Sequence, residues 1–147
     1  MTLETFREID RRGRGEDPAL FSLSSPDKCA TAQEIEDAEH LLKVLLPESY
    51  RAFPMAFGGG SYGLTTIFSA DPHSEWYLPR RQDEASAYLP DNLLAFSDDF
   101  SGGLYVFRVT NGIANDCVFY WNQDGGLVNT DYNDVFEFVA RLAYEPA

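Results

Sequence analysis

The stretch AQEIEDAEHLLKVLLPESYRAFPMAFGGG, residues Ala32–Gly60, decides the fold. Its first apolar side chains recur at helical spacing, and the Leu46-Pro47 step ends that helix because the residue before proline avoids helical angles. Thr31 followed three residues later by Glu34 is the pattern of a capping box, which predicts the start of the helix. Pro47 then opens a second helix, and the three glycines end it. We therefore expect a helical hairpin that covers a sheet.

After the glycines, the spacing of the apolar residues changes from that of a helix to that of strands. Alternating or continuous apolar runs predict strands, and residues 131–144 read as a closing helix capped by Asp131 or Asn133. The predicted strands cover residues 64–69, 92–99, 103–110, 116–122 and 127–130, and residues 71–91 read mostly as a long connection. This order indicates an α+β fold, in which N-terminal helices and a C-terminal helix pack around a mixed, largely antiparallel sheet of about five or six strands.

The length predicts one domain over residues 1–147. A chain of this size buries about 70% of its unfolded surface, so it needs no metal or disulfide to fold. Residues 3–9 indicate a short amphipathic helix that the sequence RRGRGEDP breaks, and residues 13–30 read as a loop. We therefore divide the domain into an N-terminal helix and loop, residues 1–30, and a core, residues 31–147.

The chain is strongly acidic, with a formal net charge of −13. From Gln82 to the end, two basic residues, Arg108 and Arg141, stand against eleven carboxylates. This charge argues against direct binding to nucleic acid or to an anionic membrane and permits a basic protein partner. The acidic half is either ordinary solvated surface or a face that steers a cationic partner. The sequence defines neither the oligomeric state nor a role for the basic segment Arg7–Arg14.

Two cysteines, Cys29 and Cys117, are read as reduced, partly buried thiols, with a disulfide as the less favoured alternative. The first fifteen residues contain no apolar run typical of a signal peptide. No segment approaches the roughly 20 apolar residues of a membrane span. We therefore expect a cytoplasmic protein that does not enter a membrane.

The sequence matches none of the common catalytic or metal-binding motifs. The glycine run lacks the Lys-Ser/Thr of a phosphate loop. His73 lies near Asp71 and Glu75, but this spacing matches no standard metal site. The pair Asp98–Asp99 is either a weak cation site or, more commonly, the solvated tip between two strands. We expect no enzyme activity, no metal and no cofactor.

Four pieces of the sequence together resemble the SUKH superfamily in its Smi/Knr-type branch. They are EIEDAEHLLKVLLPESYRAF followed by GGG, then LLAFSDDFSGGLYVFRV, VFYWNQDGG and VFEFVARLA, and they span residues 32–143. The chain departs from the family pattern at Phe57, where an Asn usually precedes the glycines, and at Pro54 inside the second helix. The resemblance implies an α+β, non-catalytic immunity protein of a polymorphic toxin system, which binds and neutralises a cognate toxin such as a nuclease or deaminase.

Two hypotheses about function follow. The first is an immunity protein that covers a basic toxin domain, and the alternative is a regulatory or scaffold protein of the same fold that binds another cellular protein. Aromatic anchors dominate interface energy and charge guides approach, so the expected partner-binding residues combine both. They are Glu75, Trp76, Tyr77, Asp83 and Glu84 on the long connection, and Asp98, Asp99 and Asp124 at strand tips. Trp76 and Tyr77 have a second interpretation, in which they pack on the sheet.

Overall fold

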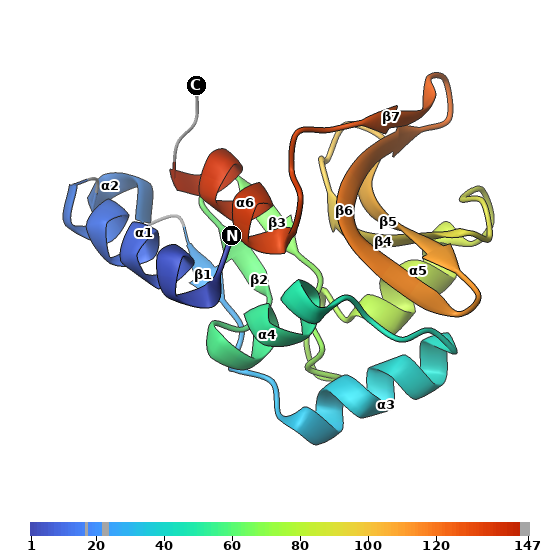
Figure 1. The fold of residues 1–147 in the computed structure, drawn as a ribbon, viewed down its shortest axis with the longest axis horizontal. Coiled ribbons are helices and arrows are strands. Elements are labelled where there is room, and N and C mark those ends of the chain that lie inside the picture. The colour runs from blue at the N-terminus through green and yellow to red at the C-terminus, as the bar shows by residue number, and fades with distance from the viewer. Residues whose placement is uncertain (17, 22–23, 145–147) are drawn as a thin grey trace.

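Helices lie at both ends of the chain, and antiparallel strands with further helices among them lie between, as Figure 1 shows. The computed structural model describes residues 1–16, 18–21 and 24–144. The helices are α1 (Leu3–Glu16), α2 (Pro18–Phe21), α3 (Ala32–Leu42), α4 (Glu48–Ala56), α5 (Leu78–Ala85), α6 (Val135–Val139) and the π-helix η1 (Ala140–Tyr144). The strands are β1 (Ser25–Pro26), β2 (Gly60–Tyr62), β3 (Thr65–Ile67), β4 (Leu93–Asp98), β5 (Gly103–Thr110), β6 (Ile113–Asn122) and β7 (Gly126–Asn129). The predicted α+β class is confirmed.

The strands form two sheets rather than the single sheet expected. One has the order β1-β2-β3 and the other the order β4-β5-β6-β7, and every pair within them is antiparallel. The two sheets meet just after β3, where the Phe68 N–H donates to the Phe96 carbonyl at 2.8 Å. Strand β4 is buried along almost its whole length because α5 packs on it and the aromatic core lies against it.

The predicted helical hairpin is present. Thr31 and Glu34 form the capping box of α3 through hydrogen bonds of 3.0 and 3.1 Å. The helix ends at Leu42, earlier than predicted, and Lys43 follows in the left-handed region. The cause is tertiary: the Leu45 N–H donates to the Gly112 carbonyl, and the Leu45 carbonyl accepts from Ala114, so this residue pairs beside β6 instead of continuing the helix.

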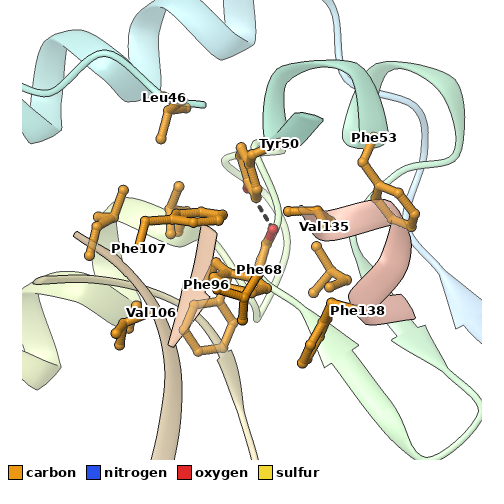
Figure 2. Close-up of a cluster of buried hydrophobic side chains, with 14 of the residues drawn as sticks. Leu46, Tyr50, Phe53, Phe68, Phe96, Val106, Phe107, Val135 and Phe138 are labelled. Atoms are coloured by element: carbon orange, nitrogen blue, oxygen red, sulfur yellow. Dashed lines mark hydrogen bonds between the residues drawn. The ribbon is translucent and has the colours of Figure 1, made fainter. Parts of the chain in front are cut away.

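The second helix, α4, anchors the core through Tyr50. This residue is buried, and its hydroxyl donates to the Phe68 carbonyl at 2.6 Å, which Figure 2 shows as a dashed line. Phe96 stacks on Phe107 at 4.3 Å and meets Phe138 of α6 edge-on at 5.1 Å. The buried aromatic residues therefore join the helical hairpin, the four-stranded sheet and the C-terminal helix in one core (Figure 2).

Helix α1 is longer than predicted, since it continues through Gly13 and Gly15 to Glu16. The 13–30 segment, expected as a loop, also contains α2 and β1. The Phe6 ring of α1 is buried and meets the rings of Phe53, Phe57 and Phe136 at 5.0–5.6 Å. This contact places α1 beside the C-terminal helix (Figure 1).

Three local predictions are corrected. The α6 N-cap is Asp134, which accepts from the Glu137 N–H at 2.9 Å, rather than Asp131 or Asn133. The turn at Asn111-Gly112 leads directly into β6, which begins at Ile113 rather than at residue 116. Both cysteines are free, but they are exposed and not partly buried.

One hydrogen-bonded network joins α4, β6 and α6. Ser49 donates to Asp116 Oδ1 from its N–H at 3.1 Å and from its hydroxyl at 2.7 Å. The same hydroxyl oxygen accepts from the Val135 N–H at 3.2 Å. The Asp116 carboxylate thus caps α4, whose own N-cap residue Pro47 has no side-chain donor or acceptor.

Candidate partner-binding surface

The turn between β4 and β5 is built around two adjacent carboxylates. Asp98 Oδ1 accepts from the Phe100 N–H at 2.7 Å. Asp99 Oδ1 accepts from the N–H groups of Ser101 and Gly103 at 2.8 Å each, and its Oδ2 accepts from the Tyr120 hydroxyl at 2.5 Å. Both carboxylate oxygens of Asp99 therefore accept hydrogen bonds within the protein, whereas the contacts described for Asp98 use only one of its oxygens.

The Asp99–Tyr120 contact changes the ionisation of both groups. Burial alone would raise the pKa of Asp99, but the hydrogen bonds from Tyr120, Ser101 and Gly103 outweigh it and hold this pKa below its ordinary value of 3.8. The hydrogen bond to Asp99, with burial second, raises the pKa of Tyr120. Glycine at position 103 leaves room for this contact, because an added Cβ would lie 1.9 Å from the Tyr120 hydroxyl oxygen and would force Tyr120 or Asp99 to move.

Phe100 occupies the tip of this turn in an unusual backbone conformation. Its φ is +61°, and 60% of the residue is exposed. Its ring meets Trp76 edge-on at 5.7 Å. Trp76 is half-buried, stacks on Phe68 with ring centres 6.5 Å apart, and carries the Arg81 guanidinium 4.6 Å from its ring centre. The exposed ring of Phe100 therefore has a fixed aromatic support.

Tyr88 is a second exposed aromatic residue that is supported by a tryptophan. It is 47% exposed, and it stacks on the mostly buried ring of Trp121 with centres 5.9 Å apart and an angle of 16°. Tyr88 belongs to the segment after α5, and Trp121 lies near the end of β6. Residues distant in the sequence are thus brought to one end of the four-stranded sheet.

Both exposed aromatic residues line one groove, and we call it the turn groove. Its volume is about 420 Å³, and an adjoining depression of about 570 Å³ shares Gly102 and Gln123 with it. The turn groove is lined by Tyr88, Asp98, Phe100, Gly102, Gly103, Leu104 and Gln123. The depression adds Ser101, Tyr120, Asn122, Asp124 and Gly125. Together they form a continuous aromatic and acidic surface across two turns.

The expected partner-binding residues divide into two groups. Asp98 and Asp124 line the turn groove and its depression, Asp99 supports it, and Trp76 backs one of its walls. The remaining four, Glu75, Tyr77, Asp83 and Glu84, line neither. Glu84 pairs with Arg81 at 3.8 Å. Tyr77 precedes α5 below the Arg80 guanidinium, and burial, with Asp37 as a lesser cause, raises its pKa.

Sequence reasoning missed Tyr88, Phe100 and Gln123 as members of this surface. Phe100 carries a signal in the sequence, since it is a large apolar residue between an aspartate pair and two turn glycines. Tyr88 and Gln123 carry none, because their place in the groove depends on pairings between distant segments.

Within residues 1–16, 18–21 and 24–144, no group of three or more His, Cys, Asp or Glu side chains is arranged to hold a metal ion. The described part of the chain likewise has no helix long and apolar enough to cross a membrane.

These features define an α+β domain whose exposed aromatic and acidic residues gather at one end of a four-stranded sheet. A model of the SUKH_6 family, described as SMI1-KNR4 cell-wall, matches residues 32–139. The chain therefore belongs to the SUKH superfamily, whose SMI1-KNR4 members are generally non-catalytic. A comparison with curated proteins gave no match.

Proposed function

We propose that this protein is an immunity protein, which binds a cognate polymorphic toxin domain in the cytoplasm and neutralises it by covering its surface. Membership of the SUKH superfamily supports this role. The observation that carries it is the turn groove, where Phe100 and Tyr88 are exposed beside the Asp98 carboxylate and no basic residue is among the lining residues. Exposed aromatic anchors are typical of protein-binding sites, and carboxylates around them can steer a basic partner toward the surface.

The charge of the molecule supports a basic toxin. A nuclease or deaminase that holds nucleic acid presents positive charge around its substrate site. An inhibitor with a net charge of −13 is steered toward such a surface, which raises the association rate in a salt-dependent way. In this proposal, the aromatic residues supply the contacts, while Glu75, Asp83 and Glu84 on and before α5 add to the acidic field.

The test is co-expression with the toxin C-terminal domain encoded beside this gene. Survival of the producing cells and binding of the purified pair would be measured at low and high salt. Rescue with tight binding that weakens as salt is added would support the proposal in full. Rescue with binding insensitive to salt would contradict the electrostatic part alone. Absence of both rescue and binding would contradict the immunity role and favour the regulatory or scaffold alternative.

A further inference from the structure

We propose that the turn groove receives the guanidinium or ammonium group of an Arg or Lys side chain presented by the protein partner. The cation would lie between the rings of Tyr88 and Phe100. This inference rests on the proposed function for the identity of the partner, and it specifies the chemistry that the partner must bring.

The two walls of the groove suit a cation. Tyr88 and Phe100 both line it, and each is held by a tryptophan, at 5.9 and 5.7 Å respectively. A ring that is already fixed loses little conformational freedom on binding. The face of an aromatic ring attracts a cation through its quadrupole. Arginines of this chain already use that attraction elsewhere in the molecule, since the Arg81 guanidinium lies 4.6 Å from the centre of the Trp76 ring and that of Arg108 lies 4.7 Å from the centre of the Phe119 ring.

The charges around the groove favour a cation over a neutral or anionic group. Asp98 lines the turn groove and Asp124 lines the depression beside it, while no Lys or Arg lines either. Arg81, behind Trp76, is directed elsewhere: it pairs with Glu84 at 3.8 Å and donates to the Glu75 carbonyl at 3.0 Å. Leu104 adds an apolar contact for the methylene stem of a Lys or Arg side chain, which commonly lies along apolar surface.

The backbone at Phe100 points to a role beyond the turn itself. A φ of +61° is adopted readily by Gly and tolerated by Asn, whereas a bulky side chain is disfavoured there. Because the Phe100 ring is largely exposed, its burial does not explain why this residue occupies the position. A strained, exposed aromatic residue at a turn tip is the kind of outlier from which a binding role is inferred.

The experiment uses the full chain labelled with ¹⁵N and titrated with a capped Arg-Arg peptide amide. The uncharged isostere, a capped citrulline-citrulline amide, is the matched ligand control. We expect the Arg peptide to shift the amide signals of Gly102, Gly103 and Gln123, and the citrulline peptide to leave them unchanged. The variants Phe100→Asn and Asp98→Asn should each weaken binding about two- to fivefold, as expected for exposed cation–π and ionic contacts.

Two control variants lie outside the groove on α3. Leu41→Gln alters another residue that is 64% exposed, and Glu36→Gln removes another exposed carboxylate. Both should bind the Arg peptide like the parent chain. Circular dichroism would confirm that all four variants fold, and Asn at position 100 keeps the left-handed conformation accessible.

Several results would overturn the inference. The inference fails if the Arg peptide does not shift the amide signals of the groove residues. It also fails if Glu36→Gln weakens binding of the Arg peptide as strongly as Asp98→Asn, because that result would show diffuse attraction to the acidic surface. Equal shifts from tetramethylammonium would contradict a protein side chain as the specific occupant. If the protein rescues cells from the toxin but the Arg peptide does not shift the amide signals of the groove residues, this inference alone is overturned. Groove shifts without rescue would contradict the immunity role and leave the cation site standing.

Discussion

Gly103 leaves no free space for a side chain in the β4–β5 turn. Its missing side chain makes room for the Tyr120 hydroxyl and the Asp99 carboxylate, both within 2.6 Å of an added Cβ. We expect Gly103→Ala to lower the free energy of unfolding by about 1–3 kcal/mol, because one or both groups must move. Urea unfolding followed by circular dichroism would measure this loss.

Gly15→Ala provides the matched control for that substitution. Gly15 lies in α1 with no atom within 4 Å of an added Cβ. Alanine should therefore stabilise the helix by about 0.5–1 kcal/mol. Equal unfolding free energies for Gly103→Ala and the parent chain would contradict the packing described around Tyr120.

Asp99 makes stability depend on acid pH in a direction that follows from its lowered pKa. The unfolded carboxyl binds protons more readily, so its contribution is complete above the ordinary value of 3.8 and is lost as pH falls through the lower folded value. We expect the stability gap between the parent chain and Asp99→Asn to be constant near neutral pH and to narrow below about pH 4. Urea unfolding across pH 2.5–7 would measure this difference in unfolding free energy, which we expect to be about 1 kcal/mol at neutral pH. A difference that widens in acid would contradict a lowered pKa of Asp99 in the folded state.

At the scale of elements, Ser49 connects α4 to both β6 and α6. Ser49→Ala removes the hydroxyl that donates to Asp116 and accepts from the buried Val135 N–H. A buried N–H group that loses its hydrogen-bond partner is not compensated for the loss of its contact with water, so we expect the free energy of unfolding to fall by about 1–3 kcal/mol.

The control is Ser86→Ala, just after α5, where the hydroxyl is exposed and water can replace its bond to the Asp83 carbonyl. This control should change stability by less than about 0.5 kcal/mol. Similar values for both variants, measured by urea unfolding, would count against the network.

The elements predicted from sequence are those specified by local signals. The capping box at Thr31 and Glu34 and the strand over residues 103–110 depend on neighbours within a few residues, and both are confirmed. The sequence did not predict strands β1 and β2, because two or three residues are too few to show the alternation of apolar and polar side chains. Helix α3 ends early because Leu45 pairs with Ile113 at the start of β6, which is a tertiary contact.

The same division holds for the candidate surface. Asp98 and Asp124 could be selected as acidic turn residues from the sequence alone. The pairing of Trp76 with Phe100 and of Trp121 with Tyr88 could not, because the partners are separated by 24 and 33 positions and meet only in the folded chain. The sequence also does not indicate which carboxylate of the 98–99 pair accepts from the Tyr120 hydroxyl, because that contact depends on the pairing of β5 with β6.

At the scale of the whole molecule, a net charge of −13 on 147 residues implies self-repulsion in the folded state. Salt screens this repulsion, since the Debye length falls from about 30 Å at 0.01 M to about 8 Å at 0.15 M. We expect the thermal unfolding midpoint to rise by about 2–4 °C over this range of NaCl, equivalent to about 1 kcal/mol. A scan of midpoint against NaCl would measure it, and a falling midpoint would show that attractive ion pairs outweigh the repulsion.

The two tryptophans give the turn groove an intrinsic optical signal. The sequence contains two of them, and each touches one wall: Trp76 meets Phe100 and Trp121 meets Tyr88. Indole fluorescence responds to the polarity and mobility of its immediate surroundings. A molecule seated between the walls would therefore alter emission from both indoles at once, so occupancy of this surface can be followed in the unlabelled protein.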